Sequence, residues 1–145
     1  MNPTPIDGLE IHPLDVHADN RGWFKENWSG QRLRPVQNNI SFNARVGATR
    51  GMHAEPWDKW VSVATGRVFA AWVDLREGSE TFATKFGVEI GPDTAVFVPR
   101  GVANGFQALE DGDVRCAVGL LAFGGLLVVS HVAPLALREN RCLTL

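Results

Sequence analysis

The sequence predicts an all-β protein, a sandwich or a barrel, from three observations. Polar and apolar residues alternate along several short segments, as they do in strands with one buried face. Clusters rich in Gly, Pro and Asp interrupt the chain about every 8–12 residues. No segment shows a convincing helical period. The 145 residues suffice for one domain with a real core, so we expect a single domain over residues 1–145.

The first expected strands are a short strand and a hairpin. Residues 40–42 form a short candidate strand. Residues 60–64 alternate, Thr65 and Gly66 make a turn, and residues 68–75 run back along the first strand. Residues 77–79 then read as a loop, because Gly and Ser favour turns.

Three further strands are expected toward the C-terminus. Residues 81–90 place Phe82, Phe86, Val88 and Ile90 on one parity, which predicts a single long strand with one apolar face. Turn signals at 91–93, 99–101 and 111–113 separate the remaining segments. The strands that they bound are 95–98 and 104–109.

The composition changes near Val114. Polar and apolar residues alternate before it, whereas a long apolar run and both cysteines follow it. One interpretation is a buried final strand and a C-terminal segment. The other is that residues 115–145 are atypical and do not belong to the fold, as a shifted reading frame would produce.

Composition and charge argue against several classes of function. A net charge of −2 gives no broad basic surface, so we expect no nucleic-acid partner. Residues 116–129 form an apolar run broken by glycines, shorter than the roughly 20 residues of a membrane span, so we expect no membrane contact. The N-terminus does not resemble a signal peptide, and Cys116 and Cys142 make a poor disulfide framework. We therefore expect a cytoplasmic protein.

The segment from Arg50 to Lys59 carries residues suited to proton abstraction. Gly51 lets the backbone turn, Arg50 supplies an anion clamp, and His53 supplies an imidazole, the side chain type best suited to act as a base near neutral pH. Lys59 would stabilise a developing enolate. The alternatives are a solvated surface turn for the tetrapeptide and an edge-strand charge for Lys59.

Three other segments carry candidate binding residues. Alternation after a turn at Asp19 would place Arg21, Trp23 and Lys25 on one side of a strand, where an arginine and an aromatic ring can grip a nucleotide. Two amides, Gln37 and Asn39, would share a strand face. A third amide, Asn104, would line a cavity or cap a turn. A hydrophobic loop is the alternative for the first segment.

Metal and nucleophile signatures are weak. The all-β pattern of two histidines one residue apart is missing, and ligation by His53, Glu55 and Asp58 is the weaker interpretation of that segment. No Gly-rich phosphate loop and no Gly-x-Ser-x-Gly occur. We expect no metal and no cofactor. The remaining histidines, His12, His17 and His131, are expected to be structural or solvated.

Four blocks in order resemble the dTDP-4-dehydrorhamnose 3,5-epimerase family of nucleotide-sugar enzymes. The blocks are 19–26, 36–41, 50–53 with Lys59, and 98–106, and the resemblance covers roughly residues 10–114. It implies a cupin-like jelly roll (a double-stranded β-helix), a homodimer, a dTDP-sugar substrate and no metal. Residues 52–59 and Asn104 are closest to a branch joined in some members to a 4-keto-sugar reductase.

The resemblance also implies roles for particular residues. His53 would be the general base, Lys59 would stabilise the enolate oxygen, and Asn104 would donate to it where most members have a second histidine. Nucleotide and pyrophosphate contacts would come from a set of polar residues. These are Arg21, Glu26, Gln37, Asn39 and Arg50.

The chain departs from the family near its C-terminus. The usual acid is a tyrosine on the strand after residues 111–113, but this chain has no tyrosine and carries Arg115, Cys116 and Ala117 there. The aspartate that orients the base normally precedes a proline, where this chain has Ala133. Epimerisation of a dTDP-4-keto-6-deoxy sugar at C3, C5 or both is the expected function. The alternatives are a catalytically impaired nucleotide-sugar-binding member and a truncated product.

Overall fold

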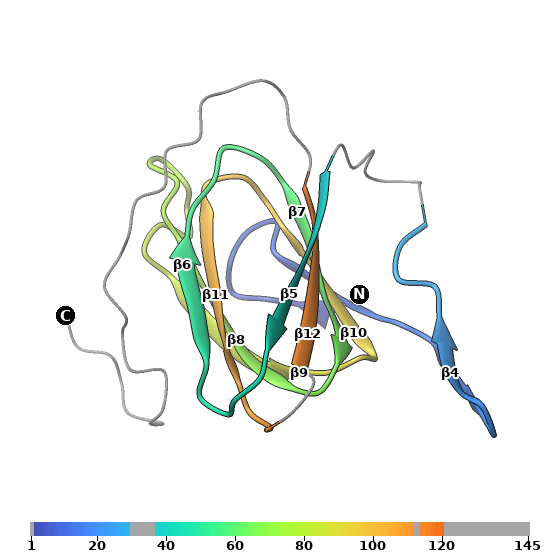
Figure 1. Cartoon of the computed structure of the whole chain (residues 1–145). Helices are drawn as coiled ribbons and strands as arrows, with labels where there is room; N and C mark the ends of the chain where they lie inside the picture. Colours follow the sequence, from blue (N-terminus) through green and yellow to red (C-terminus); the bar gives the residue numbers. More distant parts are fainter. Residues whose placement is uncertain (1, 30–36, 112–113, 121–145) are drawn as a thin grey trace.

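A computed structural model describes residues 2–29, 37–111 and 114–120. Two antiparallel sheets face each other as a sandwich that closes toward a barrel (Figure 1). The larger sheet has the order β1-β2-β10-β7-β12-β5. Its strands are β1 (Asn2–Pro3), β2 (Glu10–Pro13), β10 (Thr94–Val98), β7 (Lys59–Thr65), β12 (Val114–Leu120) and β5 (Gln37–Asn43).

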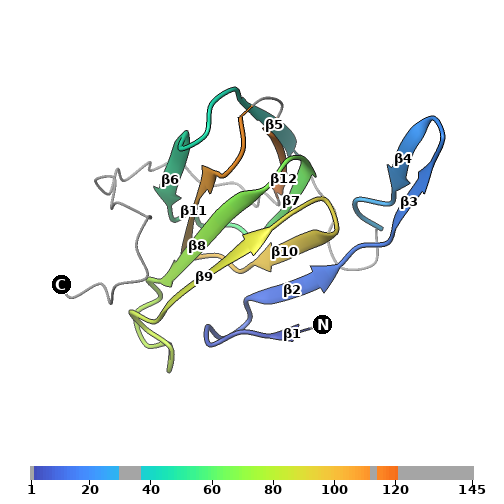
Figure 2. The same cartoon turned by 90° about the horizontal axis from the view of Figure 1, so that it is seen from below.

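The smaller sheet has four strands, and a separate hairpin leaves the body. The four strands follow the order β6-β11-β8-β9 and are β6 (Thr49–His53), β11 (Val102–Ala108), β8 (Val68–Asp74) and β9 (Lys85–Ile90). The hairpin pairs β3 (Val16–Asp19) with β4 (Gly22–Lys25). It extends away from both sheets in two views (Figures 1 and 2). The all-β prediction is therefore confirmed for the described residues.

The core lies between the two sheets and follows from alternation along their strands. On β8, Val68, Ala70 and Trp72 are buried, whereas the residues between them are only half-buried. Val61 and Val63 on β7 face them from the larger sheet within one hydrophobic cluster. Burying such side chains removes apolar area from water and supplies most of the stability of the fold.

Two sequence expectations need correction in this part of the chain. The strand expected over 81–90 begins only at Lys85, because Thr81 and its neighbours form a turn that hydrogen-bonds to buried Asp74. Phe82, expected on the apolar face, is 53% exposed. The strand expected over 104–109 is β11, which begins two residues earlier.

The composition change near Val114 does not mark the end of the fold. The backbone of β12 pairs with β7 on one side and with β5 on the other. The backbone of residues 114–120 therefore belongs to the larger sheet. The rest of the atypical segment, 121–145, lies outside the described residues, as do His131, Ala133 and Cys142.

Candidate active site

Lys59 is a buried charge at the start of β7. Its side chain is 2% exposed, and its ammonium lies 2.9 Å from the Glu55 carboxylate. The same nitrogen donates to Asn104 Oδ1 and lies 3.4 Å from the carbonyl oxygen of His53. Because β7 is an inner strand between β10 and β12, Lys59 is not the edge-strand charge that the sequence left open.

The electrostatics of Lys59 are a balance of two opposing effects. Burial lowers the pKa of its ammonium below the usual value of 10.5, because the charged form loses its hydration. The hydrogen bond and the opposite charge of Glu55 raise it again. A buried lysine whose pKa is lowered is a feature found at many catalytic sites.

His53 and Asn104 come together because their strands pair. His53 is the last residue of β6, and its register partner on β11 is Asn104. Both side chains are half-buried. Lys59 reaches across from the larger sheet and contacts both residues, Asn104 through its amide and His53 through its carbonyl. The structure thus gathers the three residues that the sequence proposed as catalytic.

Gly51 was expected to form a turn, and the structure corrects this. It lies inside β6 with a φ of +97°, a conformation that favours glycine. A Cβ atom there would lie 2.7 Å from the carbonyl oxygen of Asn104 and 2.7 Å from the Cα of Gly105. The pairing of β6 with β11 shifts register at this point. The glycine therefore allows the two strands to approach closely beside His53.

Arg50 lies on β6, the strand that ends in His53, and Gln37 and Asn39 lie on β5, which β12 separates from β7. Arg50 donates from Nε to Asn43 Oδ1 at 2.7 Å and from its guanidinium to the carbonyl oxygen of Phe42 at 3.1 Å. Gln37 donates to Asn39 at 3.1 Å, so the two amides share a face of β5. All three predicted binding residues are exposed, so a ligand can reach them.

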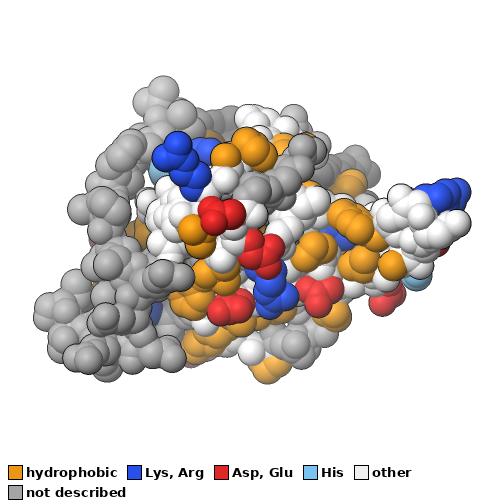
Figure 3. Space-filling model, turned by 60° about the horizontal axis from the view of Figure 1, so that its bottom comes forward, with side chains coloured by type: hydrophobic (Ala, Val, Ile, Leu, Met, Phe, Trp, Pro, Cys, Tyr) orange, Lys and Arg blue, Asp and Glu red, His pale blue; other side chains and the backbone are white. Residues whose placement is uncertain are grey.

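Arg21 and Glu26 are not brought to this cluster within the chain. Arg21 lies in the turn of the β3–β4 hairpin rather than on a strand, 85% exposed and 2.5 Å from Asp19. Glu26 follows β4 and is also exposed. Figure 3 shows the hairpin as a lobe with a basic side chain at its tip and hydrophobic side chains between it and the body.

The base of the hairpin is fixed to the larger sheet by contacts that the sequence did not indicate. Lys25 donates to the carbonyl oxygens of Val63 and Pro92, each at 2.7 Å. Burial lowers the pKa of its ammonium, and the nearby charge of Asp93 opposes this. The Trp60 indole donates to the carbonyl oxygen of Asn27 at 2.8 Å. These bonds set where the hairpin leaves the body.

A family model for dTDP-4-dehydrorhamnose 3,5-epimerase matches residues 3–117. The chain belongs to this family. Its fold is therefore the cupin-like jelly roll that the resemblance implied. The match ends within β12, so it includes both sheets and the hairpin.

Curated relatives support the same assignment. The RmlC homolog of Streptococcus pyogenes serotype M6 is 49% identical over 119 residues, which are 73% of this chain and 59% of that protein. The dTDP-4-dehydrorhamnose 3,5-epimerase of Methanothermobacter thermautotrophicus is 37% identical over 120 residues, 74% of this chain and 64% of that protein. The chain thus spans about three-fifths of the length of these relatives.

Solved structures with bound sugar nucleotides share the fold. RmlC from Streptococcus suis in complex with dTDP-D-xylose has a TM-score of 0.76 and 43% identity, over 86% of this chain and 70% of that one. RmlC from Legionella pneumophila in complex with dTDP-4-keto-L-rhamnose has a TM-score of 0.74 and 32% identity, over 84% of this chain and 71% of that one.

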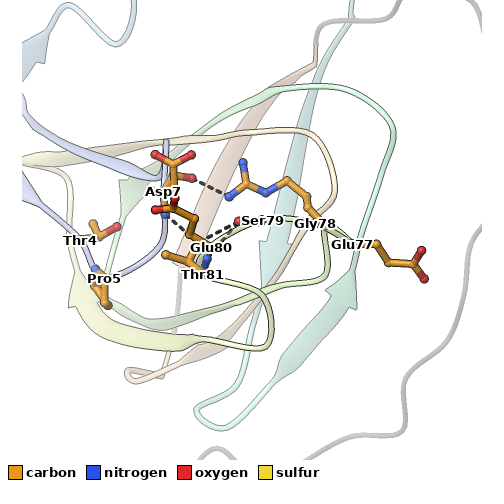
Figure 4. A pocket seen from close by; sticks show the side chains of 9 residues that line it. Thr4, Pro5, Asp7, Glu77, Gly78, Ser79, Glu80 and Thr81 are labelled. Atoms are coloured by element: carbon orange, nitrogen blue, oxygen red, sulfur yellow. Dashed lines mark hydrogen bonds between the residues drawn. The ribbon is translucent and has the colours of Figure 1, made fainter.

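Other parts of this epimerase-family chain offer little competing chemistry. Within residues 2–29, 37–111 and 114–120, no group of three His, Cys, Asp or Glu side chains is arranged to hold a metal. No helix in that part is long and apolar enough to cross a membrane. An open hollow of about 720 Å³ lies between the N-terminal segment near Asp7 and the loop near Thr81 (Figure 4). Its lining includes Arg76, Ser79 and Thr81, which donate hydrogen bonds to Asp74. None of its residues belongs to the Lys59 cluster.

Proposed function

We propose that this chain binds a dTDP-4-keto-6-deoxy sugar and epimerises it at C3, C5 or both, in the biosynthesis of a rhamnose-type deoxysugar. The observation that carries the proposal is the contact of the buried Lys59 ammonium with both Asn104 and the His53 carbonyl. A 4-keto group acidifies the neighbouring C–H bonds. The step that an enzyme must assist is therefore removal of one of those protons.

Each residue of the cluster has a part in that step. His53 takes the proton from carbon, since an imidazole is a suitable base near neutral pH. The electrons move onto the keto oxygen, where Lys59 and Asn104 stabilise the enolate. Asn104 Oδ1 accepts from Lys59, so its amide N–H groups are free to point elsewhere, including toward that oxygen. A fixed donor in a site closed to water is worth far more than in solution.

The nucleotide half of the substrate would be held by exposed polar residues of β5, β6 and the β3–β4 hairpin. Arg50 is held against β5 by its hydrogen bonds to Asn43 and to the Phe42 carbonyl, and Gln37 and Asn39 lie toward the other end of the same strand. Arginine suits a pyrophosphate because its planar donors can bind two oxygens together. We expect Arg21 and Glu26 to add contacts from the hairpin.

We propose that the hairpin acts in a homodimer. It carries Trp23 and Phe24, which are 46% and 69% exposed, on an arm that leaves its own body. β5, an edge strand of the larger sheet, exposes Ile40 and Phe42 at 68% and 54%. A second copy would cover both apolar surfaces and receive Arg21 near its own site. The 4-keto product also needs a hydride donor, so we expect a keto-sugar reductase to act next.

A second candidate function is binding without inversion. The chain contains no tyrosine, the residue that returns a proton on the opposite face of the sugar in the family. A chain with a working base and no opposite acid would exchange the C–H proton with solvent and return it to the same face. Such a protein would hold the sugar nucleotide and leave its configuration unchanged.

One experiment separates these functions. The purified protein is incubated in D₂O with dTDP-4-keto-6-deoxyglucose, and NMR follows deuterium at C3 and C5 together with the product configuration. Deuterium with inversion supports the epimerase, and deuterium without inversion supports the second candidate. No deuterium from folded protein that binds dTDP would exclude the base assigned to His53.

The dimer has its own test. Light scattering measures the mass in solution, and a mixture of His53→Ala and Arg21→Ala proteins measures whether the two sites share residues. If the hairpin serves its partner, the mixture forms some sites with both native residues and regains exchange activity that neither variant has alone. A monomer, or a mixture as inactive as its components, would exclude a shared site.

A further inference from the structure

Glu55 is the one negative charge bonded to Lys59 among the described residues. It follows β6 in the loop before β7, and its side chain is 23% exposed whereas that of Lys59 is 2% exposed. The other contacts of the ammonium are the neutral oxygens of Asn104 and His53. Asp58 in the same loop is occupied by Arg100, whose backbone N–H donates to it at 2.8 Å.

The geometry also distinguishes the three protons of the ammonium. A lysine ammonium has three N–H donors and no acceptor. Two of them have close partners, the Glu55 carboxylate and Asn104 Oδ1. The partner left for the third is the His53 carbonyl oxygen, which lies 3.4 Å away, a long distance for a hydrogen bond. That N–H is the one available to donate a hydrogen bond to a substrate oxygen.

We propose that Glu55 is a positioning residue for the reaction, fixing the Lys59 ammonium against Asn104 and keeping it protonated. This inference rests on the function proposed above. Without the carboxylate, a buried ammonium would be held only by neutral oxygens, and the neutral amine would be favoured. A neutral amine carries no charge to stabilise an enolate. The Glu55 side chain is 23% exposed, so water also reaches its carboxyl group.

The surroundings of Lys59 make the titration simple to interpret. Glu55 faces it from the loop and His53 from the end of β6, while the β11 residue, Asn104, does not titrate. On β12 only the backbone register partner, Leu120, is described. A carboxylate at hydrogen-bond distance favours the charged form of a neighbouring amine. Removing it therefore lowers the pH at which Lys59 loses its proton.

The test measures Lys59 directly and does not need activity. The lysines of this chain are Lys25, Lys59 and Lys85, so side-chain NMR of ¹³C-labelled lysine resolves few signals, and Lys59→Met assigns the one of interest. In Glu55→Gln, Lys59 is expected to titrate at lower pH than in the native protein. Glu89→Gln removes the same charge from an exposed residue of β9 and is expected to leave Lys59 unchanged.

The same variants are then assayed for solvent exchange across the alkaline range. At high pH we expect the activity of Glu55→Gln to fall about tenfold below that of native protein for each pH unit by which the Lys59 titration moves down, because the protonated fraction changes about tenfold per unit. Glu55→Asp keeps the charge and is expected to recover part of the loss. An unchanged Lys59 titration in folded Glu55→Gln would overturn the proposal.

Failure of the inference and failure of the proposed function give different results. If Lys59 responds to Glu55→Gln but the native protein never exchanges the sugar proton, the function is wrong and the contact stands. If Glu55→Gln does not fold, the contact is tested in native protein by NMR titration of Glu55. The Glu55 carboxyl carbon must then show a second inflection at the pH where Lys59 titrates, and its absence would overturn the contact.

Discussion

Lys59 on β7 and Asp74 on β8 are the charged side chains that the described part of the chain buries almost completely, at 2% and 0% exposure. Asp74 accepts hydrogen bonds from a ring of donors, which holds the pKa of its carboxyl well below its usual range. The first of these is Arg76, followed by Thr81 and Ser79. The pKa of Lys59 is lowered, because the loss of hydration on burial outweighs the attraction of the Glu55 carboxylate.

The difference shows which buried charge the fold needs and which one it tolerates. Asp74 is charged because its neighbours solvate it, so its network stabilises the turn between β8 and β9. One N–H of the Lys59 ammonium has only a 3.4 Å contact, and burial disfavours its charge, so burying Lys59 costs stability. A buried charge that costs stability is a feature that function explains better than folding does.

The largest effect is expected from Lys59→Met. Methionine fills the same space without the charge, so we expect solvent exchange on the sugar to fall about a thousandfold, or ~4 kcal/mol of transition-state stabilisation. The free energy of unfolding should fall by less than in Asp74→Asn, because burial already disfavours the charge of Lys59 whereas the donors around Asp74 favour the charge of its carboxylate. Lys85→Met on β9 is the control, and activity close to native in Lys59→Met would contradict the comparison.

Asp74→Asn should do the reverse. Loss of the carboxylate leaves Arg76 without its ion-pair partner, and breaking a buried pair costs ~3 kcal/mol. Urea unfolding measures this loss, with Asp15→Asn as an exposed control. Protein that remains folded should keep its affinity for dTDP. A stability equal to that of native protein would show that the Asp74 network is incidental.

The dependence of stability on pH separates the two charges. The folded pKa of Asp74 is lowered, so its contribution is complete above the unfolded value near 3.8 and is lost as pH falls below it. The folded pKa of Lys59 is also lowered, so the folded state releases its proton first as pH rises toward 10.5. Stability therefore rises with pH in both windows.

Each variant should remove one of these two slopes. Unfolding free energies measured as pH falls below about 3.8 should be flatter in Asp74→Asn than in native protein. Those measured at the alkaline end should be flatter in Lys59→Met. If Asp74→Asn flattens the alkaline window instead, the assignment of the two charges is wrong.

Local patterns of the sequence predicted the centre of the fold. The hairpin of β7 and β8 was expected within a residue or two, because alternation and its glycine turn are local signals. The predicted start of β9 was wrong, because residues 81–84 form a turn that hydrogen-bonds to Asp74. Strands β1 and β2 were not predicted, since β2 gains its regular structure from pairing with the distant β10.

The candidate site was predicted in the same uneven way. His53, Lys59 and Asn104 followed from an ordered family pattern, and strand pairing brings them together. Glu55 was considered only as a metal ligand, because its importance depends on the burial of Lys59. A lysine at the start of a strand reads equally well as an exposed edge charge. Only the position of β7 inside the sheet decides between them.

The smallest effect concerns one donor to Asp74. Thr81 Oγ1 donates to the carboxylate at 2.6 Å, and Thr94 Oγ1 donates to exposed Asp93 at 3.0 Å. Thr81→Val should cost ~1–2 kcal/mol, because a buried charged acceptor loses a bond that water cannot replace. Thr94→Val should cost less than ~0.5 kcal/mol, because water takes the place of the hydroxyl.

Urea unfolding of the two variants measures the difference, and activity should be unchanged in both, since neither threonine contacts the Lys59 cluster. Equal losses would mean that the burial of Asp74 does not strengthen its hydrogen bonds. The contrast between the two buried charges would then depend on Lys59 alone. Unequal losses in the expected order would place the stability of the β8–β9 turn in the ring of donors and leave the site on β7 free for chemistry.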